Sequence, residues 1–225
     1  MATWIQQRNE LLGKAVIANL AKRNMEGYYC ATKEEALQKA LELIPETDVV
    51  TWGGSVSIDE IGLLAAVKAR NPVIDRDTAS TMEEKVEMMR KGLTCDTFLM
   101  STNALSEDGI LVNIDGNGNR VASLIFGPKQ VVIIVGVNKI AKDLDSAIAR
   151  ARGTAAPVNA QRFAGISVPC AKTGVCANCN APDCMCCQVV VTRHSRQAGR
   201  IKIILVGENL STPFKTRSLS FHLRG

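Results

Sequence analysis

The sequence has few aromatic residues and few histidines, and it contains no long apolar run. Aromatic side chains make up 4% of the 225 residues, and two residues are histidine. Aliphatic side chains therefore have to form the core. No stretch approaches the roughly 18 consecutive apolar residues of a membrane-spanning helix, and the N-terminus does not have the pattern of a secretion signal. These absences predict a cytoplasmic protein without a membrane span.

Runs of Lys and Arg with interleaved aromatics are also missing, although the formal net charge is +5. Nucleic-acid-binding proteins normally concentrate basic side chains on one face, so we expect no nucleic-acid partner. The chain shows no Ser-His-Asp, Cys-His or paired-histidine set with a recognisable spacing. The residues alone therefore leave the catalytic residues unknown.

The chain does contain an alternation of helical and strand patterns, at a length that suits one domain. Helical spacing of apolar residues predicts helices at 5–20, 36–44, 57–69, 81–92 and 143–152, the third with a capping box formed by Ser57 and Glu60. Apolar and β-branched runs predict strands at 48–52, 72–74, 96–101, 130–136, 188–193 and 200–207. This alternation favours an α/β fold with a mostly parallel sheet covered by helices.

A hairpin is predicted in the middle of the chain. Residues 110–115 and 120–127 resemble two short strands, and the tetrapeptide Gly-Asn-Gly-Asn at 116–119 separates them. Gly and Asn tolerate the positive φ angles that a tight turn requires. We therefore expect a β-hairpin insertion in the otherwise parallel sheet.

A glycine loop follows the predicted strand at 48–52. Gly53, Gly54 and Ser55 lie between that strand and the next helix, where free N–H groups can bind a carboxylate or a phosphate. The loop has neither the Lys-Ser/Thr ending of a P-loop nor a full GxGxxG, so a plain tight turn is an alternative.

Polar residues also follow other predicted strands. Ligands of open α/β sheets bind at the carboxyl ends of strands, so Ser55, Asn103, Asn138 and Lys139 are expected to converge. A solvated turn is the alternative for the polar residues between 103 and 120. The expected ligand is a small carboxylate or a phosphorylated metabolite. The candidate ligand-binding residues are Gly53, Gly54, Ser55, Asn103, Glu107, Asp108, Gly109, Asn113, Gly127, Asn138 and Lys139.

Six of the eight cysteines lie within residues 170–187. Cytosolic thiols are kept reduced, so such a cluster suggests metal ligation before disulfides. Cys176 and Cys179 form a CxxC, which lets one turn of backbone direct two thiolates at one metal ion. Zinc and an iron–sulfur cluster both accept four thiolates, and the spacing does not choose between them. Cys30 and Cys95 stand apart and are expected in the core.

Several segments together resemble a known family. They are WGGSVSIDEIGLL (52–64), STNALSEDGILVNIDGNGNRVASLIFGPK (101–129), VGVNKIAKDLDSAIARAR (135–152), AAPVNAQR (155–162), PCAKTGVCANC (169–179) and RIKIILVGENL (200–210). Their order and combination resemble the LUD family of bacterial lactate utilisation proteins, in its stand-alone form with a cysteine-rich C-terminus. The likeness runs from about residue 5 to residue 210.

The resemblance implies a Rossmann-like, mostly parallel sheet similar to the sugar-isomerase and CoA-transferase-like superfamily. The composition of the chain shifts at 153–187, which looks like a loop region, so we place a boundary near residue 165. It separates a LUD-type α/β domain at 1–165 from a segment at 166–210. That segment contains the cysteines and returns strands to the same domain. Residues 211–225 have no counterpart in the family pattern, and we expect a flexible basic tail there.

The resemblance also implies a component of a system that oxidises lactate, or a related small 2-hydroxy acid, to pyruvate. The family pattern places the metal ligands at Cys170, Cys176, Cys179 and Cys186, and the additional Cys184 and Cys187 leave the fourth ligand open. A four-iron four-sulfur cluster is expected, with zinc as the alternative.

Such a chain would be an oxidoreductase subunit that is inactive alone, works with iron–sulfur partner subunits and can form a homo-oligomer. The alternative function is a regulatory or scaffold protein that binds a small anion and has a structural zinc site. The two differ in the metal that the cysteine segment would bind.

Overall fold

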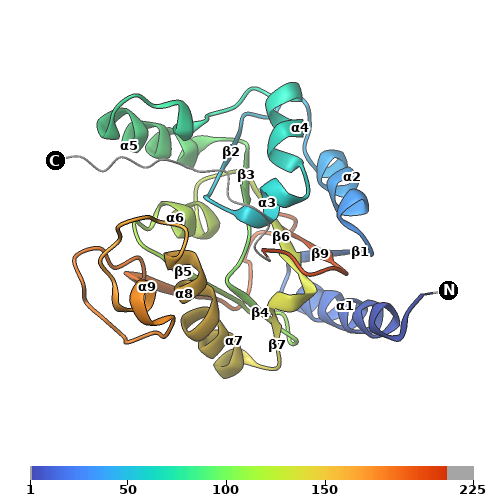
Figure 1. Cartoon of the computed structure of the whole chain (residues 1–225). Coiled ribbons are helices and arrows are strands. Elements are labelled where there is room, and N and C mark those ends of the chain that lie inside the picture. The colour runs from blue at the N-terminus through green and yellow to red at the C-terminus, as the bar shows by residue number, and fades with distance from the viewer. Residues whose placement is uncertain (1, 212–225) are drawn as a thin grey trace.

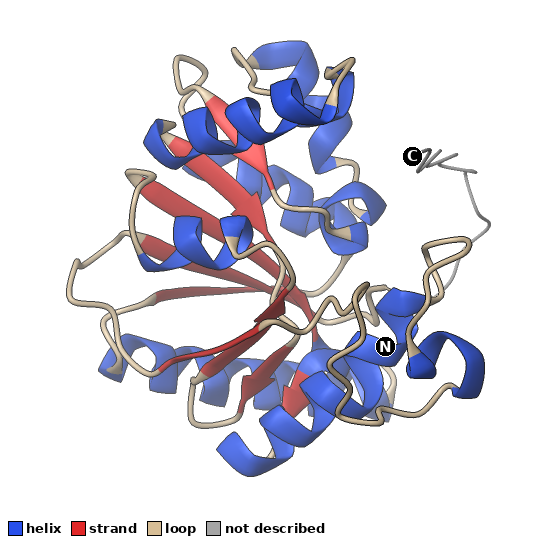
Figure 2. Ribbon diagram, turned by 90° about the vertical axis from the view of Figure 1, so that its left-hand side faces the viewer, coloured by secondary structure: helices blue, strands red, loops and turns tan. Residues whose placement is uncertain are grey.

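The structure is a computed structural model, and it describes residues 2–211. All of the predicted tail except Ser211 therefore lies outside the described residues. The centre of the fold is a five-stranded parallel sheet, whose strands fan through the molecule in Figure 2. Its strand order is β1 (Glu26–Cys30), β9 (Ile201–Val206), β6 (Gln130–Gly136), β3 (Thr97–Met100) and β2 (Val50–Trp52). The predicted α/β class and mostly parallel sheet are confirmed.

Helices cover both faces of this sheet (Figure 1). One face packs against α1 (Trp4–Lys22) and α6 (Asn119–Ile125), and the other packs against α2 (Lys33–Leu43), α3 (Val56–Glu60) and α4 (Leu63–Arg70). The middle strand β6 is buried almost throughout, as its continuous apolar run predicts. In the described part of the chain, no helix is long and apolar enough to span a membrane.

A second, smaller sheet of four strands lies beside the first. Its order is β7 (Ile140–Ala141), β4 (Ala104–Ser106), β5 (Leu111–Asp115) and β8 (Gln188–Thr192). Strands β4 and β5 are antiparallel neighbours, so they form the hairpin of the fold. Helix α7 (Leu144–Arg150) packs on this sheet and continues through a π-helical turn (Ala151–Ala155) into α8 (Ala156–Ala160).

The hairpin therefore forms at other residues than predicted. Residues 110–115 do become β5, but residues 120–127 contain helix α6 in place of a strand. The Asp115 carboxylate accepts hydrogen bonds from the N–H groups of Gly118 and Val121, which starts the helix. Val121 and Leu124 then bury themselves at helical spacing, a pattern that a short apolar run does not distinguish from a strand.

The segment 57–69 also differs from its prediction. It forms two helices, because Gly62 adopts the left-handed conformation with φ of 79° between α3 and α4. The predicted capping box is wrong, since Ser55 is the N-cap and makes no side-chain cap bond. Ser57 and Glu60 instead contact residues that are distant in sequence. By contrast, Thr81 caps α5 (Met82–Lys91) as its pattern predicts.

Two further differences concern short strands. Strand β1 was not predicted, and the predicted strand at 72–74 is reduced to a single bridge between Val50 and Val73. Strands β8 and β9 confirm the two runs predicted after the cysteine segment, and they join the smaller and the larger sheet respectively.

Candidate functional site

The ends of parallel strands bring polar residues together at one edge of the large sheet. Gly53 follows β2, Ser101 follows β3, and Lys139 ends the 3-10 turn (Val137–Lys139) that follows β6. Because these strands run in the same direction, their carboxyl ends meet at that edge. The side chains of Ser57, Ser101, Arg120, Lys139 and Arg150 gather there, and we call them the strand-end cluster.

Lys139 is the centre of this cluster and is 8% exposed. Its Nζ atom donates to Ser57 Oγ at 2.8 Å and to Ser101 Oγ at 2.9 Å. The pKa of Lys139 is lowered to about 7, first by burial and then by the positive charges of Arg150 and Arg120, whereas Glu60 acts in the opposite direction. A substantial fraction of the amine is therefore neutral near pH 7.

The two serine hydroxyls are positioned by the surrounding protein. Ser101 Oγ lies 2.6 Å from the carbonyl oxygen of Ile134 and donates to it, so this hydroxyl receives the lysine hydrogen bond as an acceptor. Ser57 is fully buried, and its Oγ lies 2.7 Å from Ser211 Oγ. The neutral lysine nitrogen therefore contacts two different hydroxyls. The proton of Ser101 is held by the Ile134 carbonyl, whereas that of Ser57 can be exchanged with Ser211 or with the lysine.

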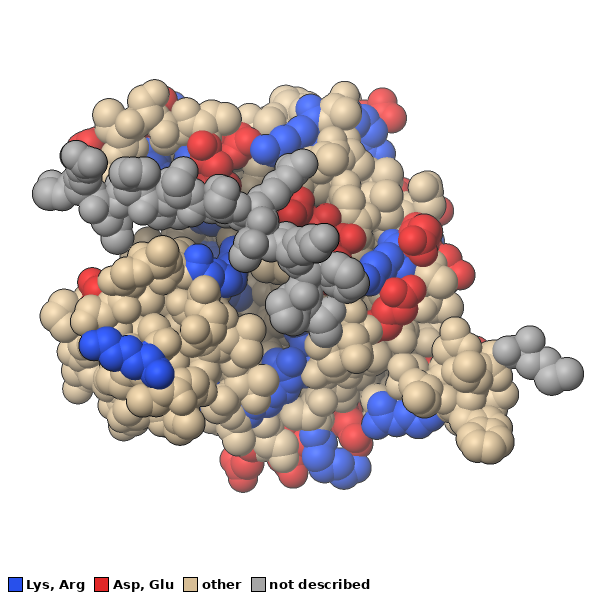
Figure 3. Space-filling view, in the orientation of Figure 1, with Lys and Arg blue, Asp and Glu red and all other residues tan. Residues whose placement is uncertain are grey.

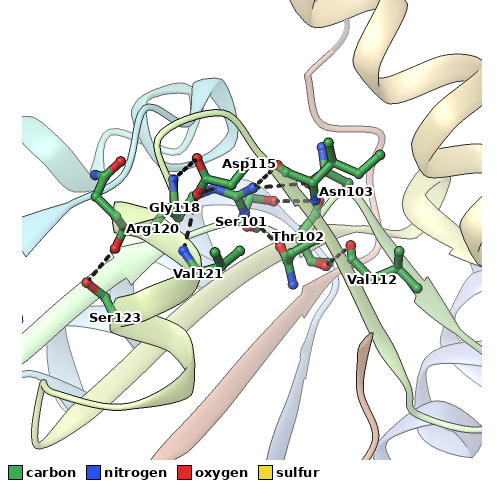
Figure 4. Close-up of polar contacts among 12 residues, drawn as sticks. Ser101, Thr102, Asn103, Val112, Asp115, Gly118, Arg120, Val121 and Ser123 are labelled. Carbon is green, nitrogen blue, oxygen red and sulfur yellow. Dashed lines mark hydrogen bonds and ion pairs between the residues drawn. The ribbon is translucent and has the colours of Figure 1, made fainter. Parts of the chain in front are cut away.

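Arg120 fixes the polar side of the cluster (Figure 4). One terminal nitrogen donates to the Ser101 carbonyl and to Asn113 Oδ1, and the other donates to Asn103 Oδ1 and to the Ile114 carbonyl. Its Nε also lies 3.6 Å from the Asp115 carboxylate. All of these acceptors belong to the protein, so Arg120 contributes charge and rigidity to the site.

Further positive charge and unused donors lie around the glycine loop. A Cβ atom on Gly54 would lie 3.2 Å from an Arg76 terminal nitrogen, and one on Gly53 would lie 2.8 Å from Arg120 Cδ. Ser55 Oγ, Arg76 Nε and Asn113 Nδ2 are buried and have no hydrogen-bond partner in the described chain. In Figure 3, Lys and Arg side chains gather around a hollow in the middle of this face.

The structure brings together only part of the predicted ligand-binding set. The glycine loop (Gly53, Gly54 and Ser55), Asn103, Asn113 and Lys139 lie in or beside the strand-end cluster. Asn138 lies next to Lys139 in the chain, but its side chain exchanges two hydrogen bonds with the Leu210 backbone. Its amide is therefore occupied by the protein.

The other predicted ligand residues lie elsewhere. Glu107, Asp108 and Gly109 form the β4–β5 turn, which packs on the C-terminal end of α1, where the Asp108 carboxylate pairs with Arg23. Gly127 precedes β6 and therefore lies at the opposite end of that strand from Lys139; a Cβ atom there would lie 2.4 Å from the Leu93 carbonyl oxygen. The local sequence made these residues resemble ligand contacts, but their backbone serves turns.

Sequence reasoning did not assign Ser57, Ser101, Arg120 and Arg150 to the site. Arg150 lies on α7 and donates to the backbone carbonyls of Asn138 and Asn103. The available signal was the position of Ser101 directly after a buried strand. Arg120 and Arg150 carried no such signal, because their helices reach the site only through the tertiary fold.

The cysteine segment forms a separate, largely irregular region after α8. Between residues 161 and 187 only Val168 is buried, and the short helix α9 (Pro169–Thr173) is the only helix or strand there. An open depression of about 380 Å³ separates it in part from α7, and Cys176, Asn178 and Arg152 line it. Few apolar contacts therefore hold this segment to the domain.

The four predicted metal ligands are neighbours in this segment. The pKa of Cys186 is raised to about 11, first by partial burial and then by the nearby thiols of Cys184, Cys170, Cys176 and Cys179. The donor set is four thiols, which suits a zinc ion or an iron–sulfur cluster. Among residues 2–211, however, no three Cys, His, Asp or Glu side chains are already gathered closely enough to hold a metal ion.

Comparison with known proteins gives a family match over almost the whole described chain. The family model of the LUD domain matches residues 13–206. The chain belongs to the LUD domain family. Both the strand-end cluster and the cysteine segment lie within the matched residues of this LUD domain. A search of curated proteins finds no match.

One solved structure similar to this LUD domain is the crystal structure of a DUF162 family protein from Deinococcus radiodurans. The sequence identity is 12%, the TM-score is 0.48, and the alignment covers 89% of this chain and 98% of that chain.

Proposed function

We propose that this LUD domain binds a small 2-hydroxy acid, lactate or a close relative, as one component of a system that oxidises it to pyruvate. The observation that supports the proposal best is the concentration of buried positive charge at the strand-end cluster. Arg120 and Arg150 both lie near Lys139, and Arg76 lies near Arg120. A small anion would offset this charge.

The chemistry of the site suits a carboxylate with a neighbouring hydroxyl. The carboxylate can accept hydrogen bonds from Arg76 Nε, Ser55 Oγ and Asn113 Nδ2, which are buried donors without a hydrogen-bond partner in the described residues. Arg76 Nε also lies 4.0 Å from the Asp77 carboxylate. Arg120 is already bonded to protein acceptors, so it attracts the anion through charge. The neutral Lys139 amine can accept the proton of the substrate hydroxyl.

Oxidation also requires an acceptor for the hydride, normally a flavin or a nicotinamide. We propose that partner subunits supply this acceptor, so the isolated chain is inactive with lactate. The residues described here would bind and orient the acid and hold the hydroxyl proton.

In this proposal the cysteine segment holds an iron–sulfur cluster through Cys170, Cys176, Cys179 and Cys186. When bound, such a cluster would pass single electrons to or from a partner subunit. The raised pKa of Cys186 favours its thiol form in the absence of metal. A bound metal ion would favour the thiolate form and so lower this pKa.

The test is lactate-dependent dye reduction by the purified chain, with and without the products of neighbouring genes, together with growth of a deletion strain on lactate. The proposal expects dye reduction only in the combined sample and slow growth of the deletion strain. Unimpaired growth, with no change in dye reduction on addition of the chain, would reject a role in lactate oxidation.

A second candidate function is an anion-binding regulatory or scaffold protein with a structural zinc site. It is favoured by the cysteine segment, where a single buried residue between 161 and 187 leaves little to stabilise the loop without a metal. Zinc without iron in protein purified under anaerobic conditions, combined with lactate or pyruvate binding and no redox activity, would support this candidate.

A further inference from the structure

We propose that the Lys139 amine forms a covalent imine with a small 2-oxo acid such as pyruvate, at the strand-end cluster. The choice of acid rests on the proposed function, because a 2-oxo acid is the oxidised form of a 2-hydroxy acid. The imine itself rests on the surroundings of Lys139.

The surroundings of Lys139 differ from those of other lysines in this chain. Lys33, Lys68 and Lys129 each lie within 2.7 Å of a carboxylate oxygen, an arrangement that keeps an ammonium protonated. Across residues 2–211, Lys139 forms no such ion pair, and its two hydrogen-bond partners are the hydroxyls of Ser57 and Ser101. It is therefore an amine held by neutral groups at the end of a central strand.

The charged groups around Lys139 favour its neutral form. Arg120 on α6 and Arg150 on α7 both oppose a charge on the amine, while Glu60 on α3 favours it. Glu60 is itself engaged, because its carboxylate pairs with Lys33 at 2.7 Å and accepts the Ser211 N–H. A desolvated lysine beside other cations is the environment in which this side chain becomes nucleophilic at neutral pH.

The same cluster can hold the carboxylate of the acid. Arg76 Nε and Asn113 Nδ2 are buried donors without a hydrogen-bond partner among the described residues. Arg76 is close enough for its positive charge to lower the pKa of Arg120. The Arg120 guanidinium donates to the carbonyl of Ser101. Ser101 Oγ in turn accepts from Lys139, so the carboxylate donors and the amine belong to one connected group.

The reaction needs no oxidant or reductant. The lone pair of Lys139 Nζ attacks the C2 carbonyl carbon, and the carbonyl oxygen takes up a proton to give a carbinolamine. The attacking nitrogen loses one proton to become neutral. The carbinolamine hydroxyl then takes up a proton and leaves as water while the nitrogen lone pair forms the C=N bond, and loss of the remaining N–H proton gives the neutral imine. Ser57 Oγ is 2.8 Å from the nitrogen and 2.7 Å from Ser211 Oγ, so it can carry a proton between them. Hydrolysis reverses each step and releases the acid.

The test is reductive trapping on the full-length protein. The protein is incubated with pyruvate and sodium cyanoborohydride near pH 7, digested, and searched by mass spectrometry for N-(1-carboxyethyl)lysine. We expect this modification at Lys139 at least tenfold faster than at exposed Lys129, whose side chain is 82% exposed. Lactate has no carbonyl group and gives no adduct. Lys139→Met should remove the main adduct, whereas Lys129→Met should leave it, with circular dichroism confirming that both variants fold.

Parallel calorimetry with pyruvate on the wild type and on Arg76→Met separates this inference from the proposed function. Binding that Arg76→Met weakens, without an adduct at Lys139, would overturn the imine and leave the carboxylate site in place. Neither binding nor an adduct would overturn both. Labelling of lysines in proportion to their exposure would also overturn the imine.

Discussion

Lys139 Nζ lies 2.8 Å from Ser57 Oγ, although the two residues are 82 positions apart in the chain. The contact joins the turn after β6 to the second residue of α3, and both groups are almost inaccessible to water. It therefore fixes the spacing between two strand ends at the centre of the proposed site. A buried amine in this position affects stability as well as chemistry.

Replacing Lys139 with Met should stabilise the fold, and the gain should depend on pH. The folded-state pKa of Lys139 is lowered from 10.5 to about 7, so between these values the unfolded chain binds a proton that the folded chain does not. Wild-type stability therefore rises with pH across this window, by up to about 1.4 kcal/mol per pH unit from this group. The gain from Lys139→Met should be largest at pH 6 and small at pH 10, as measured by urea unfolding.

The matched control is Lys129→Met, because Lys129 is exposed and pairs with Asp96. Its effect should be within about 0.5 kcal/mol at pH 8, as for most surface changes. An equal pH dependence in both variants would mean that burial of Lys139 is not its source.

Arg120→Lys should destabilise the protein, although it conserves the charge. Arg120 donates to four acceptors, and a lysine ammonium cannot reproduce this fork. Each buried acceptor left without a partner costs about 1–3 kcal/mol, so we expect a loss of at least about 3 kcal/mol in the free energy of unfolding.

Arg90→Lys is the control for this change, since Arg90 is 69% exposed and pairs with Glu87 on its own helix. Its effect should be small, at about 0.5 kcal/mol or less. Similar losses for the two arginines would show that the Arg120 network does not stabilise the fold.

Gly127→Ala should destabilise the fold without changing the binding of small acids. Gly127 has φ of 122°, and an added Cβ would lie 2.4 Å from the Leu93 carbonyl oxygen. The strain should cost about 2 kcal/mol or more. Gly153→Ala is the matched change, because no atom of residues 2–211 lies within 4 Å of the added Cβ position and the residue is helical. This variant should gain up to about 1 kcal/mol in stability. Thermal unfolding and pyruvate calorimetry on both variants test this prediction. If only Gly127→Ala loses pyruvate binding, Gly127 does contribute to the ligand site.

The metal content of the cysteine segment should depend on four thiols. We expect serine substitution at Cys170, Cys176, Cys179 or Cys186 to lower the iron content of anaerobically purified protein, with loss of its brown colour. Substitution at Cys184 or Cys187 is the control, and a loss at either one would identify it as the fourth ligand. If neither iron nor zinc approaches one site per chain and all thiols titrate as free, this segment holds no metal centre.

The sequence predicted the elements whose signals are local. The apolar spacing of α1 and α2 and the Thr81 cap of α5 each lie within one segment, and the structure confirms them. Helix α6 was mistaken for a strand because its capping carboxylate, Asp115, lies before the glycines that resembled a hairpin turn. Strand β1 was missed because its short sequence EGYYC begins only four residues after the end of α1 and has little alternation.

Only the site residues that directly follow predicted strands could be predicted from the sequence. Lys139 and the glycine loop follow apolar strands, so their convergence followed from the parallel sheet. Ser57 was mistaken for a helix cap because Glu60 stands three residues later, whereas its true partners are Lys139 and Ser211. Partners that distant in sequence leave no local pattern, and the same is true of Arg150.

The position of β9 constrains how the protein can be made. Residues 201–206 form the strand between β1 and β6, and they come after the cysteine segment in the chain. During synthesis the ribosome therefore releases all six clustered thiols before the central sheet can close. Such long-range parallel pairing is slow to form. The cysteines thus pass through a period in which they are tethered to an incomplete domain, and a cell that loads a metal there can do so before folding ends.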